Sequence, residues 1–203
     1  IEANTASGHA YGILPYGTVS VGGTALIRAI STGGAAYAAQ TQGTLNIDGG
    51  TFEATAASNA RTLFAYVGGK ITVDGNPEIK AEATSGSEAY PVYSHTTNSE
   101  VVINGGTYTS KGISTSGSIM GIRTVSNGVV TVNDGTFTLN GGSNWTFGAF
   151  ANGGTINLNG GTFTLSQPTG GNVEAVRVYP DGVCNISGGT YTVNANAKQS
   201  AGN

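Results

Sequence analysis

One pattern recurs seven times along the chain of 203 residues, and this repetition constrains the fold more than any other feature of the sequence. Each copy alternates apolar and polar residues, passes through a short stretch rich in glycine, asparagine and aspartate, and then alternates again. The copies cover residues 19–27, 45–54, 71–81, 101–110, 130–139, 156–165 and 184–193. Their last apolar residue before the glycine-rich stretch recurs every 26 to 30 residues, at Val21, Ile47, Val73, Ile103, Val132, Leu158 and Ile186.

Both halves of a copy alternate with period two and place β-branched and aromatic residues at the apolar positions. This pattern predicts two half-buried strands and excludes a helix. A third short apolar segment precedes each copy and is followed by turn residues such as Gly43, Gly69 or Asn127-Gly128. The third segments are residues 12–14, 36–39, 63–67, 90–93, 119–125, 147–151 and 173–179. One period therefore holds three strands and three turns.

A unit of this size cannot bury its own apolar side, but stacked units can, because each strand then pairs in parallel with its counterpart in the next unit. The sequence predicts an all-β fold, a right-handed parallel β-helix of about seven coils with three short strands per coil. Residues 1–203 are expected to form one domain. An internal stack of mostly aromatic side chains is expected along the rod, at Phe52, Ile79, Tyr108, Phe137, Phe163 and Tyr191.

The glycine-rich turns predict a second ladder on the outside, at Asp48, Asp74, Asn104, Asn133, Asn159 and Ser187. Asn and Asp bond their own backbone in turns, and the glycines that follow supply positive φ. The third copy has the longer sequence Gly75-Asn76-Pro77-Glu78, so we expect one extra residue there. Insertions at residues 85–89, 111–118 and 141–145 predict a variable corner after the second strand.

Motifs such as NGGTF, NGGTY and SGGTY, followed by alternating threonines, resemble the repeats of secreted bacterial right-handed β-helix proteins. These are the pectate-lyase-like adhesive and carbohydrate-binding domains of bacterial surface proteins. The resemblance covers nearly the whole chain and implies an extracellular location at the cell surface. Because similar coils serve lyases, hydrolases, phage tail proteins and adhesins, the motif specifies the fold better than the function.

The composition of the chain argues against several classes of partner and site. The chain has 8 basic and 11 acidic residues and a net charge of −3, which argues against nucleic acid as a partner. No apolar run approaches the roughly 18 residues of a membrane span, so no membrane insertion is expected. The one cysteine, Cys184, excludes an internal disulfide and a CxxC metal site, and its alignment with Leu45, Ile71, Val101, Val130 and Ile156 places it in the core.

The two ends of the chain lack an obvious cap. The sequence opens at Ile1 without an initiating Met or signal peptide, which suggests a processed or excised segment of a larger surface protein. Residues 194–203 contain no large apolar side chain that could cover the last coil, and residues 1–9 are scarcely better. We therefore expect a neighbouring domain or a partner chain to cover at least one end.

The sequence contains no visible catalytic constellation, and no cofactor or metal is expected. A polysaccharide lyase or hydrolase would need an acidic calcium cluster with a basic residue, or two to three convergent carboxylates. Asp48 and Asp74 lie one coil apart and are interpreted as turn residues, with a weak shared calcium site as the alternative. His9 and His95 fall in different repeats, near the start and in a predicted turn, which provides no Ser-His-Asp arrangement.

Three surface features remain as candidates for binding. Arg123 and Arg177 share one face two coils apart, either as solvated charges or as a clamp for an acidic sugar. Four successive coils predict a flat two-column array at Thr107, Thr109, Thr136, Thr138, Thr162, Thr164, Thr190 and Thr192. This array resembles the ice-contacting faces of β-helical antifreeze proteins, although threonine is also a common outward residue on strands. Aromatic residues near the third strand provide candidate sugar contacts at Tyr66, Tyr93, Trp145 and Tyr179.

The sequence thus favours a non-enzymatic adhesion or glycan-binding domain that contacts a polysaccharide or a cell-surface glycan. A lyase-like or hydrolase-like β-helix enzyme is the alternative, and a structural stalk or an ice-binding array is the third hypothesis.

Overall fold

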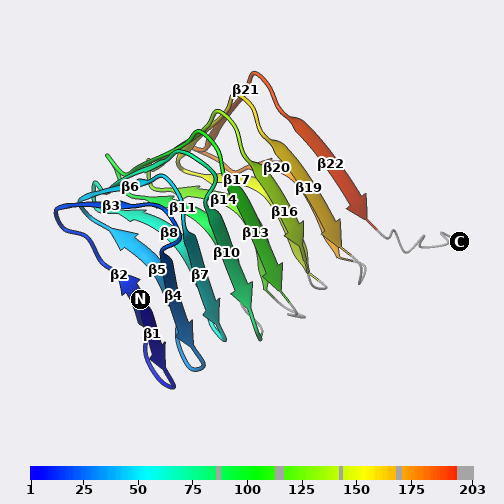
Figure 1. The fold of residues 1–203 in the computed structure, drawn as a ribbon. Helices are drawn as coiled ribbons and strands as arrows, with labels where there is room; N and C mark the ends of the chain where they lie inside the picture. The colour runs from blue at the N-terminus through cyan, green and yellow to red at the C-terminus, as the bar shows by residue number, and fades with distance from the viewer. Residues whose placement is uncertain (86–87, 113–116, 142–143, 168–170, 196–203) are drawn as a thin grey trace, which may run out of the picture.

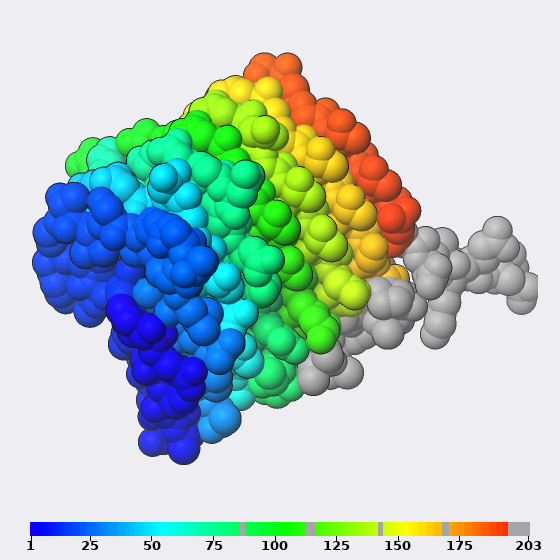
Figure 2. Space-filling view, viewed as in Figure 1, coloured from blue at the N-terminus to red at the C-terminus, as the bar shows by residue number. Residues whose placement is uncertain are grey.

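The computed structural model describes residues 1–85, 88–112, 117–141, 144–167 and 171–195. The described residues form 22 strands and no helix, in three sheets that contain only parallel neighbours (Figure 1). We call the three sheets A, B and C. The chain contributes one strand to each sheet in this order and then repeats the order, so successive coils follow one another along the molecule as adjacent bands of colour (Figure 2). The predicted β-solenoid of about seven coils with three strands per coil is confirmed.

The strand bounds follow the repeat. Sheet A contains β1 (Glu2–Thr5), β4 (Leu26–Ser31), β7 (Thr51–Ala56), β10 (Glu78–Ala83), β13 (Thr107–Gly112), β16 (Thr136–Asn140), β19 (Thr162–Gln167) and β22 (Thr190–Ala195). Sheet B contains β2 (Ala10–Ile13), β5 (Ala36–Thr41), β8 (Ala60–Tyr66), β11 (Ala89–His95), β14 (Ser118–Val125), β17 (Trp145–Asn152) and β20 (Asn172–Val178). Sheet C contains β3 (Thr18–Val21), β6 (Thr44–Ile47), β9 (Lys70–Val73), β12 (Glu100–Ile103), β15 (Val129–Val132), β18 (Thr155–Leu158) and β21 (Val183–Ile186).

The apolar anchor residues of the seven copies form one continuous ladder in sheet C, with Val21 opposite Ile47 and Leu158 opposite Ile186 at its two ends. The five anchors from Ile47 to Leu158 are buried. Ile186, in the last coil, is 56% exposed. Cys184 pairs with Ile156 in the same sheet and packs partly against the core, and this burial raises the pKa of its thiol.

The predicted aromatic stack lies on the inner face of sheet A. Phe137 is fully buried, and its ring centroid lies 4.4 Å from that of Tyr108 and 4.3 Å from that of Phe163, with nearly parallel planes. Tyr191 continues the stack in the last coil. The Tyr108 hydroxyl donates a hydrogen bond to the Gly105 carbonyl oxygen, so its only polar atom is satisfied in an apolar environment that raises its pKa.

The turn ladder is a chain of side-chain hydrogen bonds along the corner between sheets C and A. The amide of Asn133 donates to Asn104 Oδ1 at 2.7 Å, and the amide of Asn159 donates to Asn133 Oδ1 at 2.9 Å. Asn104 donates to Asp74, and Ser187 donates to Asn159, so the chain of bonds extends over five coils. The second glycine of these turns has positive φ, for example 96° at Gly106, as predicted.

Two local features refine the sequence interpretation. Val73 pairs with Ile47 and Glu78 pairs with Thr51, so the turn of the third copy holds one extra residue, as expected. The start of the chain forms a strand that the repeat did not predict, because β1 pairs with β4 and adds an eighth strand to sheet A.

The predicted variable corner includes residues 86–87, 113–116 and 142–143, which lie outside the described residues. No helix among the described residues has the length and apolar character needed to span a membrane.

Replacing Phe137 with alanine should lower the free energy of unfolding by about 3–5 kcal/mol, because it removes a ring packed on both faces by neighbouring coils. Thr138→Ala is the matched control on the same strand. Its side chain is exposed, so the loss should stay below about 0.5 kcal/mol. Urea denaturation of both variants measures the difference, and equal losses would contradict the assignment of the two strand faces.

Candidate functional site

The strands of sheet B do not alternate regularly, and this irregularity shapes their outer surface. The ladder of paired residues is interrupted once between every pair of neighbouring strands. The positions skipped in every pair of strands are Gly12, Ala38, Thr62, Pro91, Gly121, Gly148 and Ala175, and between β11 and β14 Tyr90 and Met120 are skipped as well. Two side chains three residues apart consequently face outward together: the ring centroids of Tyr90 and Tyr93 lie 5.7 Å apart, and those of Phe147 and Phe150 lie 5.2 Å apart.

Small residues and proline suit this position for a physical reason. A Cβ atom on Gly148 would lie 2.4 Å from the Ala175 carbonyl oxygen, and one on Gly121 would lie 2.6 Å from the Gly148 carbonyl oxygen. Pro91 has no N–H to contribute, so it fits a strand only where the ladder is already interrupted. The column of small residues therefore coincides with the interruption of the ladder, and the outward side chains on either side of it lie together.

Two open hollows lie along the outer face of sheet B, among these outward side chains. The first, of about 350 Å³, is lined by His9, Tyr11, Tyr37, Gln40, Arg61, Phe64, Tyr66, Tyr93 and His95. The second, of about 240 Å³, is lined by Glu88, Ser118, Met120, Arg123, Trp145, Phe147, Phe150, Asn152, Arg177 and Tyr179. We call them the N-terminal hollow and the C-terminal hollow. They meet where the Arg123 guanidinium lies 5.5 Å from the Tyr93 ring centroid.

The two hollows together take lining residues from all seven strands of sheet B, and we call this combined surface the groove. Six strand spacings of about 4.8 Å give a length of about 29 Å parallel to the rod axis. A groove of this length suits a linear chain of several units better than one small molecule.

Most of the aromatic rings in this groove stack on one another and are buried. Phe64 and Tyr93 lie 4.6 Å apart with an interplanar angle of 7°, and Tyr11 and Tyr37 lie 4.9 Å apart with the same angle. Burial raises the pKa of Tyr93. Except for the exposed Tyr11, these rings belong to a second hydrophobic cluster outside the main core, so they build the wall of the groove and present few open faces to solvent.

Arginines lie between the rings along the groove. The Arg61 guanidinium lies 5.3 Å from the Tyr93 ring centroid, and that of Arg177 lies 4.2 Å from the Trp145 ring centroid. Arg123 Nη1 donates to the Tyr90 hydroxyl at 2.6 Å and forms an ion pair with Glu88 at 3.2 Å. Such contacts between cations and ring faces stabilise both groups when they are partly withdrawn from water.

The structure brings all four sequence-predicted aromatic residues to this groove. Tyr66 and Tyr93 line the N-terminal hollow, and Trp145 and Tyr179 line the C-terminal hollow. Their accessibility differs, because Tyr93 is only 6% exposed while Tyr179 is 44% exposed. Tyr179 meets Phe150 edge-on at 5.0 Å, which makes it the most accessible aromatic candidate of the four.

Sequence reasoning missed several residues of the groove, including Arg61, Tyr37 and Phe64. These side chains belong to the two outward columns on either side of the small-residue position. A recurrent pair of large residues three apart, with a glycine, alanine, threonine or proline after the first, was the signal that could have identified them. Arg123 and Arg177 do share one face, two coils apart, with Phe150 between them.

The two histidines lie closer together than the repeats suggested. His95 is the last residue of β11 and not a turn residue, and both His9 and His95 line the N-terminal hollow. The His95 ring stacks at 5.6 Å on Tyr66. Burial, together with the positive charges of Arg61 and Arg123, lowers the pKa of His95.

The threonine array occupies a different face. Thr136 pairs with Thr107 and Thr162, and Thr138 pairs with Thr109 and Thr164, which confirms two parallel columns on sheet A. Thr190 and Thr192 extend the columns into the last coil. In the earlier coils the second column carries Arg28, Glu53 and Lys80, which form ion pairs. The array is therefore limited to the last four coils.

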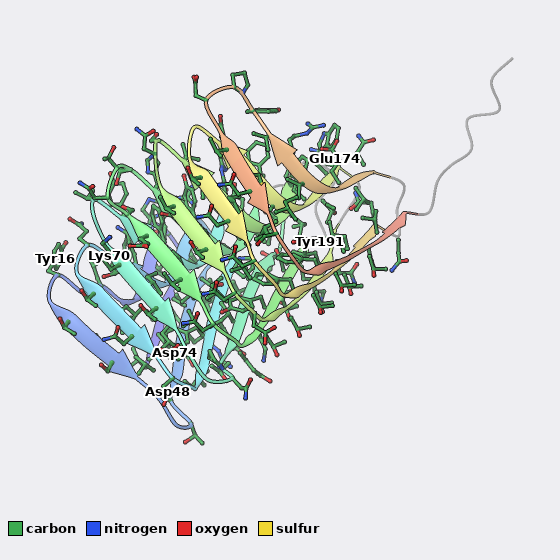
Figure 3. All side chains as sticks on the ribbon, turned by 90° about the horizontal axis from the view of Figure 1, so that it is seen from above. Tyr16, Asp48, Lys70, Asp74, Glu174 and Tyr191 are labelled. Carbon is green, nitrogen blue, oxygen red and sulfur yellow. The ribbon has the colours of Figure 1, made fainter. Side chains whose placement is uncertain are left out.

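Asp48 and Asp74 lie on neighbouring coils at the corner between sheets C and A, on a different side of the molecule from Glu174 (Figure 3). Both are exposed and line an open hollow, and Asp74 accepts a hydrogen bond from Asn104 at 2.8 Å. Within the described residues, no group of three or more His, Cys, Asp or Glu side chains is arranged to hold a metal ion. The pair is part of the turn ladder.

Comparisons of the chain with protein-family models, with curated proteins and with solved structures found no significant match. The argument for function consequently depends on the groove itself.

His95 should make the stability of the protein depend on pH. Its folded-state pKa lies below the ordinary value of 6.5, so the unfolded chain takes up the proton at a higher pH. The contribution is present above the ordinary pKa and is lost as pH falls through that value toward the folded-state pKa. Urea denaturation between about pH 7.5 and about pH 5 should therefore show a smaller decrease in stability for His95→Gln than for the wild type. An identical decrease in both proteins would contradict this assignment.

Proposed function

We propose that the protein is a non-enzymatic glycan-binding domain, and that the groove on sheet B holds a linear polysaccharide along the rod axis. The observation that carries this proposal is the pair of adjoining hollows lined from all seven strands of sheet B, in which polar side-chain tips emerge between buried rings. Sugars offer many hydroxyl groups, and the groove offers guanidinium, phenol, imidazole and carboxamide groups that donate or accept hydrogen bonds.

The architecture supports contact through an extended surface. Sugar hydroxyls would lie over the polar edges of the wall, while the exposed Tyr179 ring provides an apolar platform. Glu88 lines the C-terminal hollow and pairs with Arg123, and Glu174 pairs with the lining residue Arg177, so both carboxylates are engaged in ion pairs. This arrangement favours binding over acid–base catalysis, which needs carboxylates free to exchange protons.

A location outside the cell, on a surface protein, accords with this role. The repeat motifs resemble those of secreted β-helix proteins, and a polysaccharide ligand is available there. The exposed apolar residues of the last coil, such as Ile186 and Val183, accord with a neighbouring domain or partner chain that covers this coil.

A binding screen tests the proposal. The protein is applied to a glycan array and to insoluble polysaccharides such as cellulose, and Tyr179→Ala is compared with the wild type. Loss of the exposed ring should weaken binding by about two- to tenfold, because an aromatic contact contributes about 0.5–1.5 kcal/mol.

Tyr16→Ala is the matched control, because Tyr16 is 69% exposed and does not line the groove. Its affinity should equal that of the wild type. Equal weakening in both variants, or the absence of binding to every glycan and polysaccharide tested, would overturn the proposal.

A further inference from the structure

The groove carries unbalanced positive charge at only one of its two ends. In the C-terminal hollow, Arg123 pairs with Glu88 at 3.2 Å and Arg177 pairs with Glu174 at 2.5 Å. In the N-terminal hollow, no described carboxylate lies within ion-pair distance of Arg61. All six other lysines and arginines among the described residues have a carboxylate partner, so Arg61 is the exception in this part of the chain.

Aromatic rings surround the Arg61 guanidinium, where the other arginines have a carboxylate. Its guanidinium lies 5.5 Å from the Tyr37 centroid and 5.6 Å from the Phe64 centroid, and its Nη1 donates to the Tyr37 hydroxyl at 3.0 Å. The Nε atom is buried and has no acceptor in the described structure. Rings hold the guanidinium in place but leave its charge in a partly desolvated position, where an anion would be bound more strongly than in open water.

The positive charge of Arg61 also acts on His95, which lines the same hollow. His95, on the neighbouring strand β11, has a lowered pKa to which the positive charge of Arg61 contributes after burial. The imidazole is therefore neutral near neutral pH and can donate or accept a hydrogen bond. His9 and Gln40 complete the polar lining of the hollow.

We infer that the N-terminal hollow binds an anionic group of the glycan, a uronate carboxylate or a sulfate ester, through Arg61, while neutral sugars occupy the C-terminal hollow. This inference rests on the proposed function and names its substrate class: a linear acidic polysaccharide. The planar guanidinium matches the geometry of a carboxylate or sulfate. The net charge of −3 disfavours a polyanion spread over the whole surface, but one local cation within a groove selects an acidic group at that place.

The test measures binding of three oligosaccharides of similar length by isothermal titration calorimetry. They are an oligogalacturonate, a sulfated heparin-derived oligosaccharide and neutral cellohexaose. The wild type should bind at least one acidic oligosaccharide about tenfold more tightly than cellohexaose, with an affinity that falls as salt rises. Comparison of the oligogalacturonate with the heparin-derived oligosaccharide shows whether the bound anion is a carboxylate or a sulfate ester.

Arg61→Gln should weaken binding of the acidic oligosaccharide by about tenfold or more and weaken binding of cellohexaose much less. Arg28→Gln is the control with the same change of charge, because Arg28 lies on sheet A and already pairs with Glu2 and Glu53. It should bind like the wild type.

Ring resonances of His95 provide a second measurement that needs no variant at Arg61. They should shift in the wild type on addition of the acidic oligosaccharide, and much less with cellohexaose. An acidic oligosaccharide that binds without shifting His95, or that binds Arg61→Gln as tightly as the wild type, would overturn the inference. Equal affinity of the wild type for acidic and neutral oligosaccharides would do the same and would leave the proposed function intact. Failure of every oligosaccharide and every array glycan to bind would overturn both.

Discussion

Parallel, in-register pairing between successive coils is the interaction on which the rest of this structure depends. A coil of three short strands has too little apolar surface to fold alone, so each coil relies on backbone hydrogen bonds and side-chain contacts with the coils beside it. Like residues then lie above one another. The stacked rings around Phe137 and the hydrogen-bonded amides around Asn133 are two results of this single constraint, one inside the rod and one on its corner.

The same stacking produces different surfaces on the sheets. On sheet A the outward residues alternate regularly and yield flat columns, charged in the earlier coils and occupied by threonine in the last four. On sheet B a repeated interruption of the ladder turns extra side chains outward, and their rings pack into a second cluster. The groove takes its lining from the outward residues on either side of that interruption.

The chemistry of the groove depends on how charges and rings are distributed among coils. Rings that stack along the axis cover one another's faces, so they act mainly as a rigid wall that positions arginine, tyrosine and histidine groups. Two of the three arginines are neutralised by adjacent glutamates, and Arg61 is held only by rings and a phenol. A groove with polar edges and one unbalanced cation accords with the proposed binding function, and the carboxylates Glu88 and Glu174 are engaged in ion pairs.

The repeat alone determined the architecture. A period of 26 to 30 residues with two-residue alternation leaves a parallel β-solenoid as the arrangement that buries the apolar faces of all seven copies, and the inward residues Ile47, Phe137 and Cys184 were predictable from alignment of the copies. The threonine columns and the shared face of Arg123 and Arg177 followed for the same reason. Only the tertiary structure decided the groove. The interruption of the ladder at Pro91 and Gly121 breaks the alternation on which strand faces are predicted. The charge partners of the arginines also differ from coil to coil: Arg123 pairs with Glu88, which precedes β11, Arg177 pairs with Glu174 of its own strand, and Arg61 has no carboxylate partner among the described residues. Local periodicity is encoded in neighbouring residues, whereas the charge balance of a groove depends on which side chains the stacked coils bring together.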